Sequence, residues 1–278
     1  MHPQHTAPDD GGQVEILDLD AEVLAGHTAS ITARLAQRSA PHRIVDLGCG
    51  TGAGTFALLE RFPGAQVTAV DSADAQLRAL RESAAGRGVA DRVQTVQADL
   101  DGDWPGLGRP DLVWASAAMH HMADPHRALA RVHGLLAPGG VFAVVELAGF
   151  PRFLPATAPA GRPGLEERLH AAADAVAAGH VPHRGADWGP MLTAAGFTVA
   201  DEFTVAVDVG RDGGRGDAVG RYALAGLRRM RGVAADTLDP ADLAALDELL
   251  DADGPQGVAH RDDLAVRTER TVWLAHRP

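Results

Sequence analysis

The chain has 278 residues, 46% of them hydrophobic, which suffices for one large α/β domain and excludes a disordered chain as the default interpretation. Its 25 basic and 37 acidic residues give a formal charge of −12, which argues against a nucleic-acid partner because phosphate binding needs an excess of positive charge. A single cysteine excludes an intrachain disulfide, and the sequence has neither a transmembrane run nor a signal peptide, so we expect a cytoplasmic protein without a membrane partner or a bound metal.

The first half of the sequence alternates between β-rich and helical patterns. We expect a loose tail over residues 1–12, an N-terminal helical cap over 13–40 and a regular core over 41–147. The core is expected to contain strands and helices in alternation, with strands at 43–48, 66–71, 92–99, 111–116 and 141–147 and helices at 54–62, 72–88 and 125–136. Such alternation predicts a parallel sheet with helices on both faces.

The second half is less regular but belongs to the same expected domain, 1–278. Segments 188–209 and 270–278 are expected to complete the sheet, the first as one strand or as two halves of one. Segments 148–187 and 210–269 are expected to be insertions that form a helical lid, since both leave from the carboxyl ends of strands. Helices are predicted at 165–179, 187–196, 217–231 and 240–251, after a flexible glycine-rich loop at 210–217.

The stretch "VDLGCGTGAGT", residues 45–55, has glycines at alternate positions from Gly48 to Gly54. Glycine allows a positive φ and a close approach of the backbone to a ligand. The dinucleotide fingerprint G-x-G-x-x-G is not matched, and Asp46 lies two residues before the first glycine. A carboxylate repels a pyrophosphate but attracts a cation, so an NAD-dependent dehydrogenase is the less favoured alternative.

The segment "VDLGCGTG" resembles the first motif of class I S-adenosylmethionine-dependent methyltransferases of the small-molecule type. Further motifs of that family follow in order, and the resemblance covers about residues 40–147: "VTAVDSA", "VQADL", "DLVWASAAMHHMADP" and "LLAPGGVFAVVE". The resemblance implies an α/β, Rossmann-like fold with a seven-stranded sheet in the order 3-2-1-4-5-7-6 and an antiparallel strand 7. It also implies S-adenosylmethionine as cofactor and S-adenosylhomocysteine as product.

The same resemblance implies a cofactor site. Asp71 would bind the ribose hydroxyls, Asp99 the adenine amino group, and Leu100 would lie against the adenine ring. The remaining implied cofactor-binding residues come from the glycine loop and from two strand ends: Asp46, Gly48, Cys49, Gly50, Ser72 and Ser116.

Adjacent histidines after the fourth strand are the candidate catalytic residues. His120 and His121 have a pKa suited to a general base, and His120 is slightly preferred because only one of two neighbouring side chains can face the methyl group. Either could instead order the loop. The candidate substrate residues are mostly apolar and favour an apolar or aromatic metabolite: Met119, Glu146, Phe150, Phe153, Trp188 and Tyr222. Alternatively, Arg152, Arg221 and Arg228 could bind a carboxylate or phosphate of the substrate.

The predicted function is methyl transfer by in-line displacement to O or N, less readily C, of a small metabolite, in secondary metabolism. A non-catalytic S-adenosylmethionine-binding or regulatory protein on the same scaffold is the alternative. The protein is expected to be a monomer or a homodimer.

Overall fold

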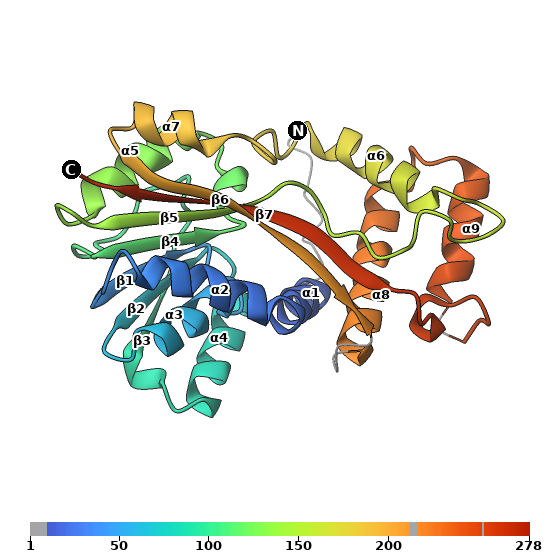
Figure 1. Ribbon diagram of the computed structural model, residues 1–278, viewed down its shortest axis with the longest axis horizontal. Coiled ribbons are helices and arrows are strands. Elements are labelled where there is room, and N and C mark those ends of the chain that lie inside the picture. Colours follow the sequence, from blue (N-terminus) through green and yellow to red (C-terminus); the bar gives the residue numbers. More distant parts are fainter. Residues whose placement is uncertain (1–9, 212–215, 252) are drawn as a thin grey trace, which may run out of the picture.

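The computed structural model describes residues 10–211, 216–251 and 253–278. Its centre is a seven-stranded sheet in the order β3-β2-β1-β4-β5-β7-β6, which confirms the predicted order (Figure 1). β7 runs antiparallel to β5 and β6, and the other strand pairs are parallel. The strands are β1 (Arg43–Leu47), β2 (Gln66–Asp71), β3 (Val93–Gln97), β4 (Leu112–Ser116), β5 (Val141–Leu147), β6 (Thr198–Gly210) and β7 (Ala265–His276).

Helices cover both faces of the sheet and extend beyond it. They are α1 (Asp10–Val23), α2 (Ala25–Ala36), α3 (Ala53–Arg61), α4 (Asp74–Gly86), α5 (Pro125–Leu135), α6 (Leu165–Ala177), α7 (Trp188–Ala194), α8 (Gly216–Val233) and α9 (Pro240–Leu250). On one face α2 and α3 bury Leu35 and Leu58 against the sheet. On the other face α5 and α7 bury Leu129 and Leu192. Both faces are therefore apolar, as the continuous hydrophobic strands of a covered parallel sheet require.

β6 and β7 continue past the rest of the sheet. β5 pairs with β7 only as far as Arg270, whereas β6 stays paired with β7 out to Gly210 and Ala265. The outer parts, residues 206–210 and 265–269, form a two-stranded ribbon that leads to α8 and α9 (Figure 1). The sheet therefore supports a second, helical part of the molecule.

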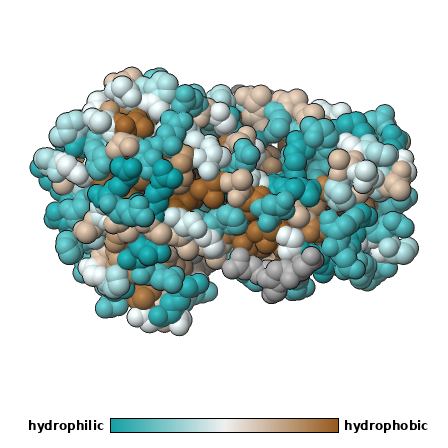
Figure 2. Space-filling model, in the orientation of Figure 1, coloured by the Kyte–Doolittle hydropathy of each residue, from teal (hydrophilic) through white to brown (hydrophobic). Residues whose placement is uncertain are grey.

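We call this second part, made of α1, α6, α8, α9 and the ribbon, the lid. It has its own hydrophobic core, separate from those of the sheet, built from residues of all its elements: Leu19, Val23, Leu165, Leu169, Val207, Val219, Leu227, Leu246, Leu249 and Val266. The space-filling view shows the resulting elongated outline, with hydrophobic residues visible between the sheet and the lid (Figure 2). None of the helices in the described ranges is both long and apolar enough to cross a bilayer.

Some predicted boundaries differ from the structure. The expected tail is replaced from Asp10 onward by α1, and the rest of it, residues 1–9, lies outside the described residues. The last strand begins at Ala265 rather than 270, because the ribbon has polar residues on one side and lacks a hydrophobic run. Residues 198–210 form one strand with an irregularity between Val199 and Asp201. Part of the expected glycine-rich loop, 212–215, lies outside the described residues, and α8 begins directly after it.

Candidate functional site

The glycine loop lies between β1 and α3, where it meets the segment after β4. Gly48 has φ +68°, and a Cβ placed on it would lie 2.5 Å from the Cβ of Ala118. A Cβ on Gly54 would lie 2.6 Å from the indole nitrogen of Trp114. Glycine is required at both positions because a side chain would push the two segments apart.

Asp71, the last residue of β2, holds the glycine loop in place. One of its carboxylate oxygens accepts the backbone N–H of Gly50 at 2.9 Å, and the other accepts that of Ala73 at 3.0 Å. The side chain therefore links the first loop of the sheet to the loop before α4. Acidic residues are common at strand ends, so the hydrogen bond from the Gly50 N–H to Asp71 could not be inferred from the sequence.

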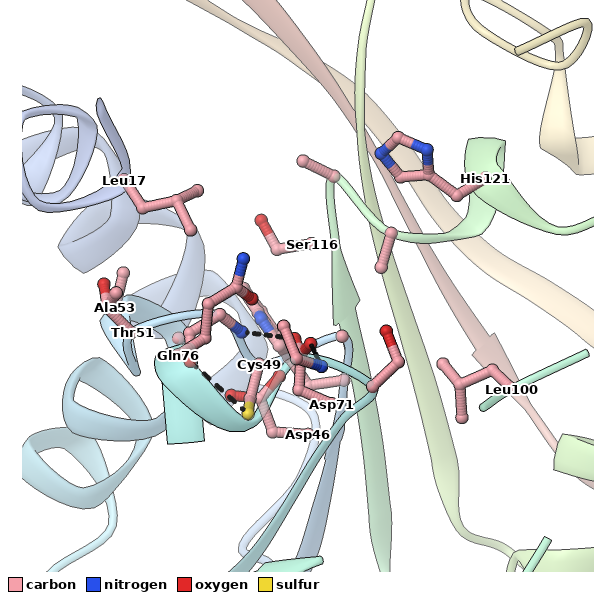
Figure 3. Close-up of a pocket in the computed structure, with 18 of the residues that line it drawn as sticks. Leu17, Asp46, Cys49, Thr51, Ala53, Asp71, Gln76, Leu100, Ser116 and His121 are labelled. Carbon is pink, nitrogen blue, oxygen red and sulfur yellow. Dashed lines mark hydrogen bonds between the residues drawn. The ribbon is translucent and has the colours of Figure 1, made fainter. Parts of the chain in front are cut away.

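A cavity of about 480 Å³ lies over the carboxyl ends of the strands. Every cofactor-binding residue expected from the sequence lines this cavity: Asp46, Gly48, Cys49, Gly50, Asp71, Ser72, Asp99, Leu100 and Ser116. Figure 3 shows Asp46, Cys49 and Asp71 at its floor, with Leu17 and His121 facing each other above them. Its size suits a ligand of the dimensions of a nucleoside derivative.

Sequence reasoning missed several residues of the cavity wall. Gln13, Leu17 and Asp20 come from α1, and Arg270 comes from β7. Arg270 Nη2 donates to Asp20 Oδ1 at 2.8 Å, and the hydroxyl of Tyr222 donates to the same oxygen at 2.7 Å. Arg270 is 8% exposed, and its Nε is buried without a partner among the described residues. No local pattern marks these residues, because the pairs that they form are far apart in the sequence.

Asp46 and Cys49 are both buried beside the cavity floor. The Thr55 hydroxyl donates to Asp46 Oδ2 at 2.7 Å. Burial raises the pKa of Asp46 to about 7, the negative charge of Asp71 adds to this, and the Thr55 hydrogen bond opposes it. Burial also raises the pKa of the Cys49 thiol, which disfavours the thiolate form that a nucleophile requires.

The two adjacent histidines have different surroundings. His120 is 4% exposed, and its Nδ1 lies 2.5 Å from Glu146 Oε2. Glu146 also accepts the backbone N–H groups of Met119 at 2.7 Å and His120 at 3.3 Å. The preference for His120 as the residue that faces the cavity is wrong, since His121 lines the cavity and His120 does not. Its ring lies against His121, with centroids 4.2 Å apart.

His121 is uncharged at neutral pH. The loss of surrounding water lowers its pKa to about 4, and the neighbouring His120, Arg184 and Arg229 act in the same direction, whereas Glu146 opposes them. The unprotonated nitrogen of a neutral imidazole can accept a hydrogen bond from an O–H or N–H group in the cavity. It is a weak base, however, so it is poorly suited to removing a proton from an alcohol.

Most of the expected substrate residues pack in cores and do not reach the cavity. Met119 and Trp188 belong to the core on one face of the sheet, and Phe153 and Tyr222 pack edge to face in the lid core, with centroids 5.3 Å apart. Phe150 lies beneath Arg184, whose guanidinium is 4.3 Å from the ring centroid. Large apolar side chains at these positions are explained by packing, and Tyr222 alone reaches the site, through Asp20.

Comparisons with known proteins agree with this geometry. Residues 45–142, which contain the glycine loop and most of the cavity wall, match a family model described as a methyltransferase domain. These residues therefore form a methyltransferase domain. Among solved structures, this methyltransferase fold resembles a candidate methyltransferase from Bacillus halodurans C-125, with a TM-score of 0.55 at 17% identity, covering 90% of this chain and 98% of that one. The YcgJ protein of Bacillus subtilis has a TM-score of 0.52 at 17% identity, covering 91% and 98%.

The curated relatives of this methyltransferase domain are similar over part of their length. A trans-aconitate 2-methyltransferase of Acidovorax sp. (strain JS42) is 42% identical over 120 residues, which cover 42% of this chain and 44% of the relative. A protein of the same name from Acidovorax ebreus (strain TPSY) is 44% identical over 105 residues, 38% of each chain. The chain therefore matches less than half the length of these relatives.

Proposed function

We propose that the protein is an S-adenosylmethionine-dependent methyltransferase that transfers a methyl group to an oxygen or nitrogen of a small molecule. The observation that carries this proposal is the convergence of the glycine loop, Asp71 and the segment Asp99–Leu100 on one cavity. The matching family model supports the cofactor, and the name of the relatives supports a small acceptor.

The residues of the cavity fit S-adenosylmethionine along its length. Asp71, already fixed by two backbone N–H groups, presents carboxylate oxygens that can accept from a ribose diol. The buried carboxylate of Asp46 favours a positively charged ligand. Asp20 and Arg270, which line the same cavity, carry charges of opposite sign, and the Nε of Arg270, which has no partner among the described residues, suits the carboxylate of an amino acid.

When bound, S-adenosylmethionine supplies a methyl group that is activated by its positive sulfur. The chain then has to align the acceptor and exclude water, and alignment can contribute roughly 7–11 kcal/mol at its upper limit. The α1 helix of the lid covers the cavity through Gln13, Leu17 and Asp20. His121, neutral and facing the cavity, is proposed to orient the acceptor by a hydrogen bond.

Calorimetry with S-adenosylmethionine, S-adenosylhomocysteine and NAD tests the cofactor, and transfer of a labelled methyl group to trans-aconitate and other small acids tests the reaction. We expect micromolar binding of the first two ligands and none of NAD. Binding of NAD alone would overturn the proposal. Tight S-adenosylmethionine binding with no transfer to any acceptor would instead favour a regulatory, non-catalytic protein.

Asp71→Ala should weaken S-adenosylhomocysteine binding by about 1–3 kcal/mol, since it removes the ribose acceptor and leaves the N–H of Gly50 without its partner. Asp74→Ala is the matched control, because Asp74 is an exposed acid of the next helix that pairs with Arg78 at 2.5 Å. Calorimetry should detect the loss only for Asp71→Ala. Equal losses in the two variants would mean that overall charge, and not the ribose contact, is responsible.

Binding of S-adenosylmethionine should release protons near neutral pH. Burial raises the pKa of Asp46 to about 7, and a cation in the cavity stabilises the carboxylate, so the pKa falls on binding and the proton leaves. Affinity should accordingly increase as the pH rises through about 7. Calorimetry in two buffers of different ionisation enthalpy measures the release, and Asp46→Asn should remove it. Release that persists in Asp46→Asn would assign the proton to another group.

A further inference from the structure

Tyr222 is the only tyrosine of the chain, and its hydroxyl links the lid to the cofactor cavity. It belongs to α8, is 4% exposed and packs edge to face against Phe153 in the lid core. A phenylalanine would fill the same space, so packing does not account for the hydroxyl. The hydroxyl donates to Asp20 Oδ1 at 2.7 Å, which gives a buried polar group its partner.

Asp20 joins Tyr222 to the sheet. The same oxygen accepts from Arg270 Nη2 at 2.8 Å, and Arg270 is the outermost residue of β7 that still pairs with β5. Asp20 and Arg270 line the cofactor cavity, whereas Tyr222 does not. Tyr222 therefore lies one hydrogen bond behind the cavity wall.

This arrangement leaves one acceptor and one donor available to a ligand. Both hydrogen bonds reach Oδ1 of Asp20, so its Oδ2 has no partner among the described residues. The Nε of Arg270 is buried and has no partner in the same part of the chain. A buried polar group without a partner costs free energy, and a ligand that pairs with it removes that cost.

The two charged groups match the two charges of an amino acid. S-adenosylmethionine ends in an ammonium group and a carboxylate, and a carboxylate beside a guanidinium is the complementary pair. Within the described ranges, Arg270 is the only arginine that lines the cavity. The arginines considered from the sequence lie elsewhere. Arg152 pairs with Glu167 at 2.7 Å, and Arg221 and Arg228 line a separate surface pocket.

We propose that Tyr222 is a positioning residue for the amino-acid end of the cofactor. Its hydroxyl fixes the Asp20 carboxylate, and through it the Arg270 guanidinium, so that Asp20 Oδ2 accepts from the ammonium group and Arg270 donates to the carboxylate. The inference rests on the proposed function and adds a lid residue that does not touch the ligand. It makes affinity for the amino-acid end depend on the lid.

Calorimetry on the full chain with two ligands tests the proposal. Methylthioadenosine has the nucleoside and the thioether of S-adenosylhomocysteine but lacks the amino-acid group. Tyr222→Phe keeps the ring in the lid core and should weaken S-adenosylhomocysteine about three- to tenfold, the size of one hydrogen bond. Arg270→Gln removes the direct contact and should weaken it about tenfold or more. Both variants should bind methylthioadenosine within about twofold of the wild type.

Thr271→Val is the matched control for loss of a hydroxyl. Thr271 follows Arg270 in β7, and its hydroxyl lies 3.3 Å from that of Thr204, outside the cavity wall. The variant should bind both ligands within about twofold of the wild type. The proposal is overturned when Tyr222→Phe weakens both ligands equally or weakens neither.

NMR on the wild type alone makes the test independent of how the variants fold. Because the chain has one tyrosine, isotope-labelled tyrosine reports on Tyr222 without overlap. S-adenosylhomocysteine should shift the Tyr222 signals as Asp20 gains a second partner, and methylthioadenosine should leave them nearly unchanged. Equal shifts with the two ligands, or none with either, would mean that the hydroxyl serves only to anchor the lid. Failure of the proposed function would appear differently, as no binding of S-adenosylhomocysteine by the wild type.

Discussion

Gly48→Ala should abolish measurable S-adenosylhomocysteine binding and lower the free energy of unfolding by about 2–5 kcal/mol. At φ +68° an L side chain is strained, and the new Cβ would lie 2.5 Å from that of Ala118. The glycine loop and the segment after β4 would have to separate, and both line the cofactor cavity. Urea denaturation and calorimetry measure the two effects.

Gly88→Ala is a matched control for this substitution. Gly88 has the same φ of +68°, but a Cβ on it would meet nothing within 4 Å. It should cost only the backbone strain, about 1–2 kcal/mol, and should leave ligand affinity unchanged. Equal losses of stability in the two variants would show that the loop relaxes around a Cβ and that the close approach to Ala118 is not required.

The second large effect is expected for Glu146→Ala. Glu146 is 2% exposed and accepts two backbone N–H groups in addition to its contact with His120. Each buried donor left without a partner costs about 1–3 kcal/mol, so the free energy of unfolding should fall by about 2–5 kcal/mol. Turnover should fall as well, because the short turn Met119–His121 that carries His121 loses its anchor.

Glu146→Gln separates stability from positioning. The glutamine keeps an oxygen that can accept the N–H of Met119. Its amide group, however, places an N–H donor beside His120 Nδ1, which can accept it only in the tautomer that carries no proton on Nδ1. The loss of stability should therefore be smaller than for Glu146→Ala, whereas turnover should still fall. Full turnover in a folded Glu146→Ala protein would exclude any role of Glu146 in placing His121.

The sheet and the cavity floor could be predicted from the sequence because their signals are local. Hydrophobic runs mark β1, β4 and β5, and the spacing of the glycines together with Asp46 favours a cationic ligand. The resemblance to methyltransferase motifs adds the expectation that Asp71 lies at the same site. In a parallel sheet, the carboxyl ends of the strands meet at one edge, so residues that follow different strands are brought together.

The upper half of the site could not be predicted in the same way. Which of His120 and His121 faces the cavity depends on Glu146, a residue of another strand. The partners of the α8 arginines depend on the rotation of that helix, since Arg229 donates to Gln13 of α1 and Arg231 pairs with Asp247 of α9. These outcomes are set by packing between distant segments.

The contact between Asp20 and Arg270 has a consequence for the order of folding. The two residues are 250 positions apart, and Tyr222, which shares the same oxygen, is 202 positions from Asp20. Ordering so long an intervening chain is slow compared with forming the local strand–helix units of the sheet. On dilution from denaturant the floor of the cavity should therefore form early, and ligand affinity should return only in a late kinetic phase.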